Sequence, residues 1–287
     1  DLPVFVYSAL LVAGFWAYIF FQGCFMTGLW IIGHECGHRG FSEYILINDA
    51  VGWVTHSFLL VPYFSWQISH RRHHSHTGDQ ALDEAHMTPH IDSLLPSAAR
   101  EHGADFAPDV EKEEYKGYMK NITVFLKELH NQLYEFNFFH RVFTMFLYVF
   151  MGFWLYLFFN LSGRKYPKSS ILPNHFLPSS PIYSPSERIL IIMSDIGLIA
   201  VLYGLYQAVQ AFSLGFVVLM YFFPYLLTNL FFVFFTFLHH TSVALPHYSH
   251  ENWTFVRGAL STIDRDNGWF YDFAWHKIAS THVCHHL

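Results

Sequence analysis

Long stretches without a charged side chain constrain the fold of this chain most. Residues 2–33 and 142–163 contain no Asp, Glu, Lys or Arg, and residues 189–238 contain only Asp195. About 20 apolar residues are enough for a helix to cross the hydrocarbon core of a bilayer. A water-soluble fold would have to bury all of these segments, so together they predict an integral membrane protein.

Composition excludes two other classes of protein. Hydrophobic residues make up 53% of the chain and aromatic residues 20%, which excludes a disordered chain. The formal net charge is −6 and no basic run occurs, which argues against a nucleic-acid-binding protein. The three cysteines form no CxxC pair, so they predict no disulfide scaffold and favour a reducing compartment.

Histidine is in excess, and many of the histidines fall into three clusters. The chain has 21 His against 16 Lys plus Arg. Residues three and four apart share one face of a helix, so we expect each cluster to present its imidazoles from one face. Eight clustered histidines exceed the four ligands of a structural zinc and predict two metal ions, while imidazole alone does not select the metal. The clusters are His34-Glu-Cys-Gly-His38, His70-Arg-Arg-His73-His74 and His282-Val-Cys-His285-His286.

Two other functions remain open at this point. The first cluster matches HExxH, so an intramembrane zinc metalloprotease would explain two histidines and leave the other clusters idle. A membrane metal transporter would carry histidines within its spans, but 2–33, 142–161 and 189–238 contain none.

If all three clusters bind one centre, they lie on one side of the membrane, and this limits the topology. The segments 2–33, 189–212 and 214–238 are predicted to span, with a turn at Ser213–Gly215 between the last two. The number of crossings between clusters two and three must be even. With 189–212 and 214–238 both crossing, the segment 142–161 is therefore expected to be interfacial or re-entrant. The segment 51–64 is apolar but short, so it is expected to be interfacial or re-entrant as well.

The loops fix the expected orientation. Residues 65–141 and 239–287 carry the second and third clusters and are predicted to be cytosolic. The loop 163–188 contains Arg164, Lys165, Lys168 and Arg188, which the positive-inside rule also places in the cytosol. The chain has no initiator Met and ends one residue after a histidine pair, so we expect a fragment.

At the three histidine clusters and the stretches around them, the chain resembles the membrane fatty acid desaturases, and among them the plant and fungal oleoyl Δ12 (omega-6) desaturases. The resemblance covers nearly the whole chain and implies a single desaturase domain over 1–287. It also implies an all-α, polytopic membrane fold with helical transmembrane hairpins and a cytosolic, histidine-rich cap that holds a di-iron site. The matching stretches are GLWIIGHECGHRGFS (28–42), VGWVTHSFLLVPYFSWQISHRRHHSHTG (51–78), LPHY (245–248), RGALSTIDRDNG (257–268) and THVCHHL (281–287).

The resemblance implies which residues bind the two irons. His240, at the end of the last apolar segment, is a further expected ligand, ahead of its neighbour His239. Glu35, Asp79, Asp264 and Asp266 are candidates to orient the ligands, by adjacency in the sequence. The expected ligands from the three clusters are His34, His38, His70, His73, His74, His282, His285 and His286.

The implied reaction is the O₂-dependent insertion of a cis double bond into an acyl chain, from oleoyl to linoleoyl. Removing hydrogen from unactivated methylenes is beyond any side-chain base, which favours redox-active iron over zinc. A Δ15 (omega-3) desaturase or a fatty acid hydroxylase would use the same site. The acyl carrier is a phospholipid or coenzyme A, and the expected location is the endoplasmic reticulum membrane.

The electrons have to come from another protein. The chain contains neither a GxGxxG fingerprint nor an HPGG haem motif, so we expect no bound flavin or haem. The resemblance implies cytochrome b5 or another external donor, and Arg71 and Arg72 are candidates for its docking site.

Overall fold

The computed structural model describes residues 3–87, 137–166, 169–242 and 245–287, and these residues form helices and loops without a β-strand. The predicted all-α class is therefore confirmed. Four helical segments are long and apolar enough to cross a membrane: Val4–Gly37, Phe138–Phe159, Pro185–Ala211 and Leu214–His240. The remainder of the predicted region 65–141, from residue 88 to 136, lies outside the described residues.

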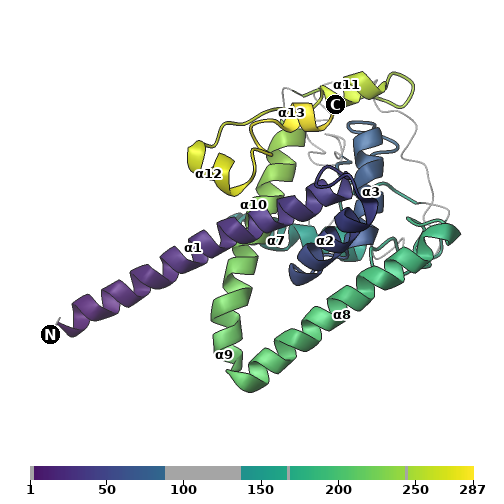
Figure 1. The fold of residues 1–287 in the computed structure, drawn as a ribbon. Helices are drawn as coiled ribbons and strands as arrows, with labels where there is room; N and C mark the ends of the chain where they lie inside the picture. The colour runs from purple at the N-terminus through teal and green to yellow at the C-terminus, as the bar shows by residue number, and fades with distance from the viewer. Residues whose placement is uncertain (1–2, 88–136, 167–168, 243–244) are drawn as a thin grey trace.

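The long helix α1 (Val4–Gly37) and helix α10 (Phe223–His240) form the centre of the fold. They pack against each other, and both end at the upper part of the molecule in Figure 1. Gly23 permits the close approach, because a Cβ atom there would lie 2.9 Å from the Leu227 side chain. Thr228 adds a hydrogen bond to the Gly23 carbonyl at 3.2 Å.

Helices α2 (Ile45–Phe58) and α3 (Tyr63–Ser75) are separated by a bend of 108°. The bend falls inside the segment 51–64, and Leu60 takes a positive φ of 55° within it. Helix α2 packs on α1, and α2 and α3 both pack on α8 (Arg188–Ala211). The prediction that 51–64 does not span remains a prediction.

Helices α8 and α10 are joined through the short α9 (Leu214–Val217) and a π-helical stretch, Val218–Phe222. The chain reverses at Ser213, whose hydroxyl accepts the Phe216 N–H at 3.2 Å. Figure 1 shows the two arms diverging from this turn. The turn lies where the sequence predicted it.

Helix α7 (Phe138–Phe159) packs on α10 and ends at Asn160, which adopts a left-handed conformation. At 22 residues it is long enough to cross a bilayer, although 142–161 was expected to be interfacial or re-entrant. Its end lies beside the loop that follows α3, since the Met87 N–H donates to the Ser162 carbonyl at 2.9 Å. The start of α8 lies beside α3 as well, through an ion pair of 2.8 Å between Arg72 and Glu187.

The C-terminal region forms three short helices, α11 (Phe255–Ala259), α12 (Trp269–Ala274) and α13 (His282–His285). Figure 1 shows α11 and α13 above the ends of α1, α3 and α10. Helix α12 packs on α1, where Gly28 leaves room for the Ala274 carbonyl. The last histidine cluster is thereby brought back to the ends of the long helices.

Candidate metal centre

The first histidine cluster lies in the last turn of α1, which ends immediately after it. Arg39 takes a φ of 62°. The N–H groups of Arg39 and Gly40 then donate to the carbonyls of Cys36 and Glu35, at 3.0 and 2.9 Å. This left-handed closure stops the helix and leaves His34 and His38 on its terminal surface.

Five histidines from all three clusters form one group, which we call the five-histidine group. The Nε2 atom of His70 lies 2.8 Å from Nε2 of His34 and 3.1 Å from Nε2 of His38 and of His74. Nitrogens bound about 2.1 Å from one ion lie about 3 to 3.5 Å apart, so this spacing fits a shared metal. The group comprises His34, His38, His70, His74 and His285, whose ligand atoms all lie within 4.8 Å of one another.

A second group consists of His73, His240 and His286, again with all ligand atoms within 4.8 Å, and we call it the three-histidine group. All three side chains are buried. His282 adjoins it, because its Nε2 lies 3.0 Å from Nε2 of His240. The two groups are neighbours, since the rings of His74 and His286 stack with centroids 4.0 Å apart.

The second and third clusters are each divided between the two groups. His70 and His74 are four residues apart and share one face of α3, while His73 points to the other group. His285 and His286 are likewise assigned to different groups. The expectation that each cluster serves a single face was therefore too simple: the HxxHH spacing supplies both groups at once.

Hydrogen bonds at the far side of the rings set which nitrogen is available. His34 Nδ1 lies 2.9 Å from the Glu35 carboxylate, and His286 Nδ1 lies 3.1 Å from the Thr77 hydroxyl. A neutral imidazole that donates from Nδ1 keeps an unprotonated Nε2 for a metal. His285 Nε2 is buried without a hydrogen-bond partner among the described residues, so it is available as a metal ligand.

Burial also keeps these imidazoles neutral. It lowers the pKa of His38 to about 4 and of His285 to about 3, and neighbouring histidines add to both shifts. Burial and the rings of His74 and His282 lower the pKa of His286 as well. Metal ligands have to be deprotonated, so the cluster is ready for a cation at neutral pH.

The predicted orienting carboxylates differ in where the structure places them. Glu35 contacts His34 and lies 3.8 Å from His285 Nδ1. Asp264 accepts the backbone N–H of Val283 at 2.8 Å, so it holds the backbone of the third cluster and not a ring. Asp79 and Asp266 contact no clustered histidine among the described residues: Asp79 pairs with His250, and Asp266 accepts the Gly268 N–H.

Sequence reasoning missed Asp83 and His86. Asp83 Oδ1 lies 2.7 Å from His73 Nδ1, and the His86 ring stacks on His240 with centroids 4.5 Å apart. Both residues lie in the irregular loop after α3, where no helical spacing relates them to the cluster. The available signal was chemical: an acidic residue and a histidine close behind the HxxHH cluster.

The remaining predicted residues have other contacts. His239 is buried, and both of its nitrogens lie on backbone carbonyls, those of Phe235 and Ala279 at 2.6 and 3.1 Å. Arg72 is held by both Glu187 oxygens, at 3.0 and 2.8 Å. Arg71, by contrast, is exposed, so it is the accessible arginine of the pair.

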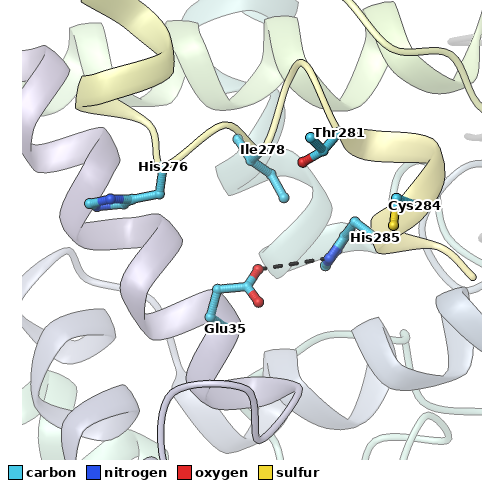
Figure 2. Close-up of a pocket in the computed structure, with 6 residues that line it drawn as sticks. All are labelled: Glu35, His276, Ile278, Thr281, Cys284 and His285. Carbon is cyan, nitrogen blue, oxygen red and sulfur yellow. Dashed lines mark ion pairs between the residues drawn. The ribbon is translucent and has the colours of Figure 1, made fainter.

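A pocket of about 250 Å³ adjoins the five-histidine group. Figure 2 shows Glu35 projecting from α1 toward His285 of α13, with Ile278, Thr281 and Cys284 on the C-terminal segment around them. Glu35 is 38% exposed here, whereas the three-histidine group is buried. The pocket therefore gives small molecules access to the edge of one group.

Comparison with known proteins identifies the family. The fatty acid desaturase family model matches residues 10–287. The chain belongs to the fatty acid desaturase family. This confirms the resemblance that the histidine clusters predicted, and the match begins within α1 and covers all three clusters.

Individual desaturase relatives match the chain over nearly its whole length. A protein of Glycine max named omega-6 fatty acid desaturase, endoplasmic reticulum isozyme 2, is 43% identical over 96% of this chain and 61% of its own length. The Delta(12)-fatty-acid desaturase of Arabidopsis thaliana is 41% identical over 93% of this chain and 60% of its own. An oleoyl-12-hydroxylase of Ricinus communis is 40% identical over 99% and 63%. The chain thus spans about three fifths of these relatives.

Proposed function

We propose that the protein is an O₂-dependent acyl-lipid desaturase that inserts a cis double bond into an oleoyl chain to give linoleoyl. The convergence of three histidine clusters and His240 into two adjacent groups carries this proposal. Relatives named as Δ12 desaturases support the position of the double bond.

The two groups are the proposed sites of two iron ions. His34, His38, His70, His74 and His285 would hold one ion, and His73, His240, His282 and His286 the other. When bound, the iron pair supplies the activation of dioxygen that removal of hydrogen from adjacent methylene carbons requires.

The surrounding residues orient the ligands and cover one side of the five-histidine group. Glu35 and Asp83 each hold one ligand ring from behind. The Trp66 ring stacks on His70 with centroids 4.3 Å apart, and Trp30 stacks on His34 at 5.5 Å. Both tryptophans are at least 95% buried, so they form an apolar wall against the five-histidine group.

The metalloprotease alternative does not fit this geometry. In that alternative Glu35 would be the general base and HECGH would bind one zinc with few protein ligands. Instead, Glu35 is hydrogen-bonded to His34, and His34 and His38 share their group with three histidines of the other clusters.

A hydroxylase is the one alternative that the comparisons favour, because an oleoyl-12-hydroxylase is as similar to the chain as the desaturases are. It would use the same ligands on the same acyl chain. A Δ15 desaturase would differ only in where the acyl chain meets the metals.

We further propose that the histidine groups face the cytosol from the endoplasmic reticulum membrane, and that cytochrome b5 or a similar donor supplies the electrons. The Arg72–Glu187 and Met87–Ser162 contacts support this orientation, since they hold the basic loop 163–188 on the same side as the second cluster. Exposed Arg71 is the proposed contact for an acidic donor surface.

Expression of the whole protein in a yeast that lacks linoleate tests the reaction, with gas chromatography of total fatty acids. New 18:2 with a double bond at Δ12 is the expected product. A hydroxy acid would favour the hydroxylase. An unchanged fatty acid profile, with the protein present and iron supplied, would contradict both. Protein purified from iron-supplied cells is expected to contain two irons per chain, whereas one zinc and no iron would favour the metalloprotease.

Orientation and docking need separate tests. A glycosylation acceptor inserted beside Lys165 is expected to stay unmodified, and its glycosylation would contradict a cytosolic loop. Arg71→Ala is expected to slow reduction by cytochrome b5 most at low salt. Arg141→Ala, at an exposed position in the first turn of α7, is the control and should leave the rate of reduction unchanged.

A further inference from the structure

Asp83 belongs to none of the histidine clusters, yet it is among the most buried carboxylates of the described chain, at 1% exposure. Its Oδ1 atom accepts from His73 Nδ1 at 2.7 Å and from the N–H groups of Ala85 and His86, both at 2.9 Å. Its Oδ2 atom accepts the Gly78 N–H at 3.0 Å. Four donors therefore fix both oxygens.

The hydrogen bond between His73 and Asp83 also selects one tautomer of His73. A carboxylate acceptor fixes His73 as the tautomer that carries its proton on Nδ1 and leaves Nε2 unprotonated.

Asp83 reaches a second member of the same group through His86. The backbone N–H of His86 is bound to Asp83, and its ring then lies parallel to that of His240, with an interplanar angle of 9° and centroids 4.5 Å apart. The same ring packs edge-on against His73 at 5.2 Å. One carboxylate thus supports His73 directly and His240 through a stacked ring.

The five-histidine group has a different carboxylate. Its contact is Glu35, which is 38% exposed at the edge of the pocket in Figure 2. Among the described residues, Asp83 bonds to no member of the five-histidine group. The two groups are therefore supported independently.

We propose that Asp83 is a positioning residue that serves the three-histidine group and not the five-histidine group. It holds His73 by a hydrogen bond and His240 through the His86 ring. This inference rests on the proposed function, in which each group binds one metal.

Asp83→Asn in the whole protein, compared with Glu84→Gln, tests the proposal. Glu84 is an adjacent buried carboxylate whose hydrogen bonds go to Tyr166, so it is the matched control. Loss of an orienting carboxylate weakens metal binding about 10- to 100-fold. After mild chelation, we expect two irons per chain in the wild type and in Glu84→Gln, and about one in Asp83→Asn.

Mössbauer spectra of ⁵⁷Fe-loaded protein give a readout independent of activity. The Asp83→Asn variant should lose the signal of one iron and keep that of the other. Retention of both irons at wild-type affinity would overturn the proposal. So would loss of both irons from a protein whose helical circular dichroism is unchanged. A wild type that binds no metal would instead refute the proposed function, and this inference with it.

Variants of His86 separate stacking from direct ligation. His86→Phe keeps a flat ring against His240 and should retain both irons, whereas His86→Ala should lose the iron of the three-histidine group several-fold faster. Equal iron loss in His86→Phe would show that the His86 nitrogen itself is required, and would overturn the role of stacking.

Discussion

The Nε2 atoms of His240 and His282 lie 3.0 Å apart, although 42 residues separate them in the chain. His240 is the last residue of α10, and His282 is the first of α13. Their contact ties the end of a long apolar helix to the C-terminal cluster. We expect this contact to be bridged by a metal in the working protein.

His240→Ala should therefore remove one of the two irons, because it takes away a member of the three-histidine group. Elemental analysis of the purified protein would measure this. His239→Gln is the matched control: His239 binds backbone carbonyls, so its variant should keep two irons even if its melting temperature falls. Equal iron loss in both variants would refute the assignment of His240.

Glu35→Gln should weaken the other group. Its carboxylate bonds to His34 Nδ1 and lies near His285, so its loss should weaken iron binding about 10- to 100-fold and speed the release of iron to a chelator. The exposed Glu43 in the same region offers a matched control, and Glu43→Gln should release iron at the wild-type rate. Slow, unchanged release from Glu35→Gln would contradict an orienting role.

Gly33→Ala should destabilise the protein, because a Cβ atom there would collide with the ring of His56 and lie 2.7 Å from the Thr55 hydroxyl. Overpacking of this kind costs about 1 to 3 kcal/mol, and the strain falls directly beside His34. Gly14→Ala has open space around it and should leave the melting temperature unchanged or raise it slightly. Similar melting temperatures for both variants in detergent would contradict the close packing of α1 and α2.

The stability of the protein should fall in mild acid, partly because of His175. This buried ring lies 3.2 Å from the Ser69 hydroxyl and 3.3 Å from the Leu157 carbonyl. Burial lowers its pKa to about 4, against about 6.5 in the unfolded chain. Below pH 6.5 the His175 ring becomes protonated in the unfolded chain, whereas in the folded protein it stays neutral down to about pH 4.

Above pH 6.5 the ring is uncharged in both the folded and the unfolded chain, so His175 makes the stability no more or less dependent on pH there. Between about pH 6.5 and 4 the free energy of unfolding falls because of His175, by up to about 1.4 kcal/mol per pH unit. His175→Gln should show a smaller fall in melting temperature between pH 7 and pH 5 than the wild type. An identical fall in both proteins would mean that the ring is protonated in the folded state.

The sequence was sufficient to predict the helical class, the turn at Ser213 and the eight clustered histidines, seven of which lie in the two groups while His282 contacts His240. These features depend on local periodicity and on residue type. The division of HxxHH between two groups needed the directions of α3 and α13 in space, which spacing alone does not give. Asp83 and His86 were missed for the same reason: they approach the histidines through an irregular loop.

The carboxylates predicted by adjacency show the limit of that argument. Glu35 contacts its histidine neighbour, but Asp79, nearer to the second cluster in sequence than Asp83, turns away to His250. Whether 51–64 and 142–161 lie in the membrane interface likewise depends on depth in a bilayer, a property that periodicity does not report.

Three helices end at the candidate metal centre: α1 with His34, α3 with His73 and His74, and α10 with His240 in their last turns. Each helix C-terminus carries about half a negative charge from its unpaired carbonyls. The backbone thus attracts cations to this point before any imidazole binds one. Such a field does not distinguish one divalent ion from another, and Zn²⁺ binds nitrogen ligands more tightly than Fe²⁺. The ion found in a preparation will therefore follow the supply of metals during synthesis, and cells grown with excess zinc should yield an inactive, zinc-loaded protein of the same fold.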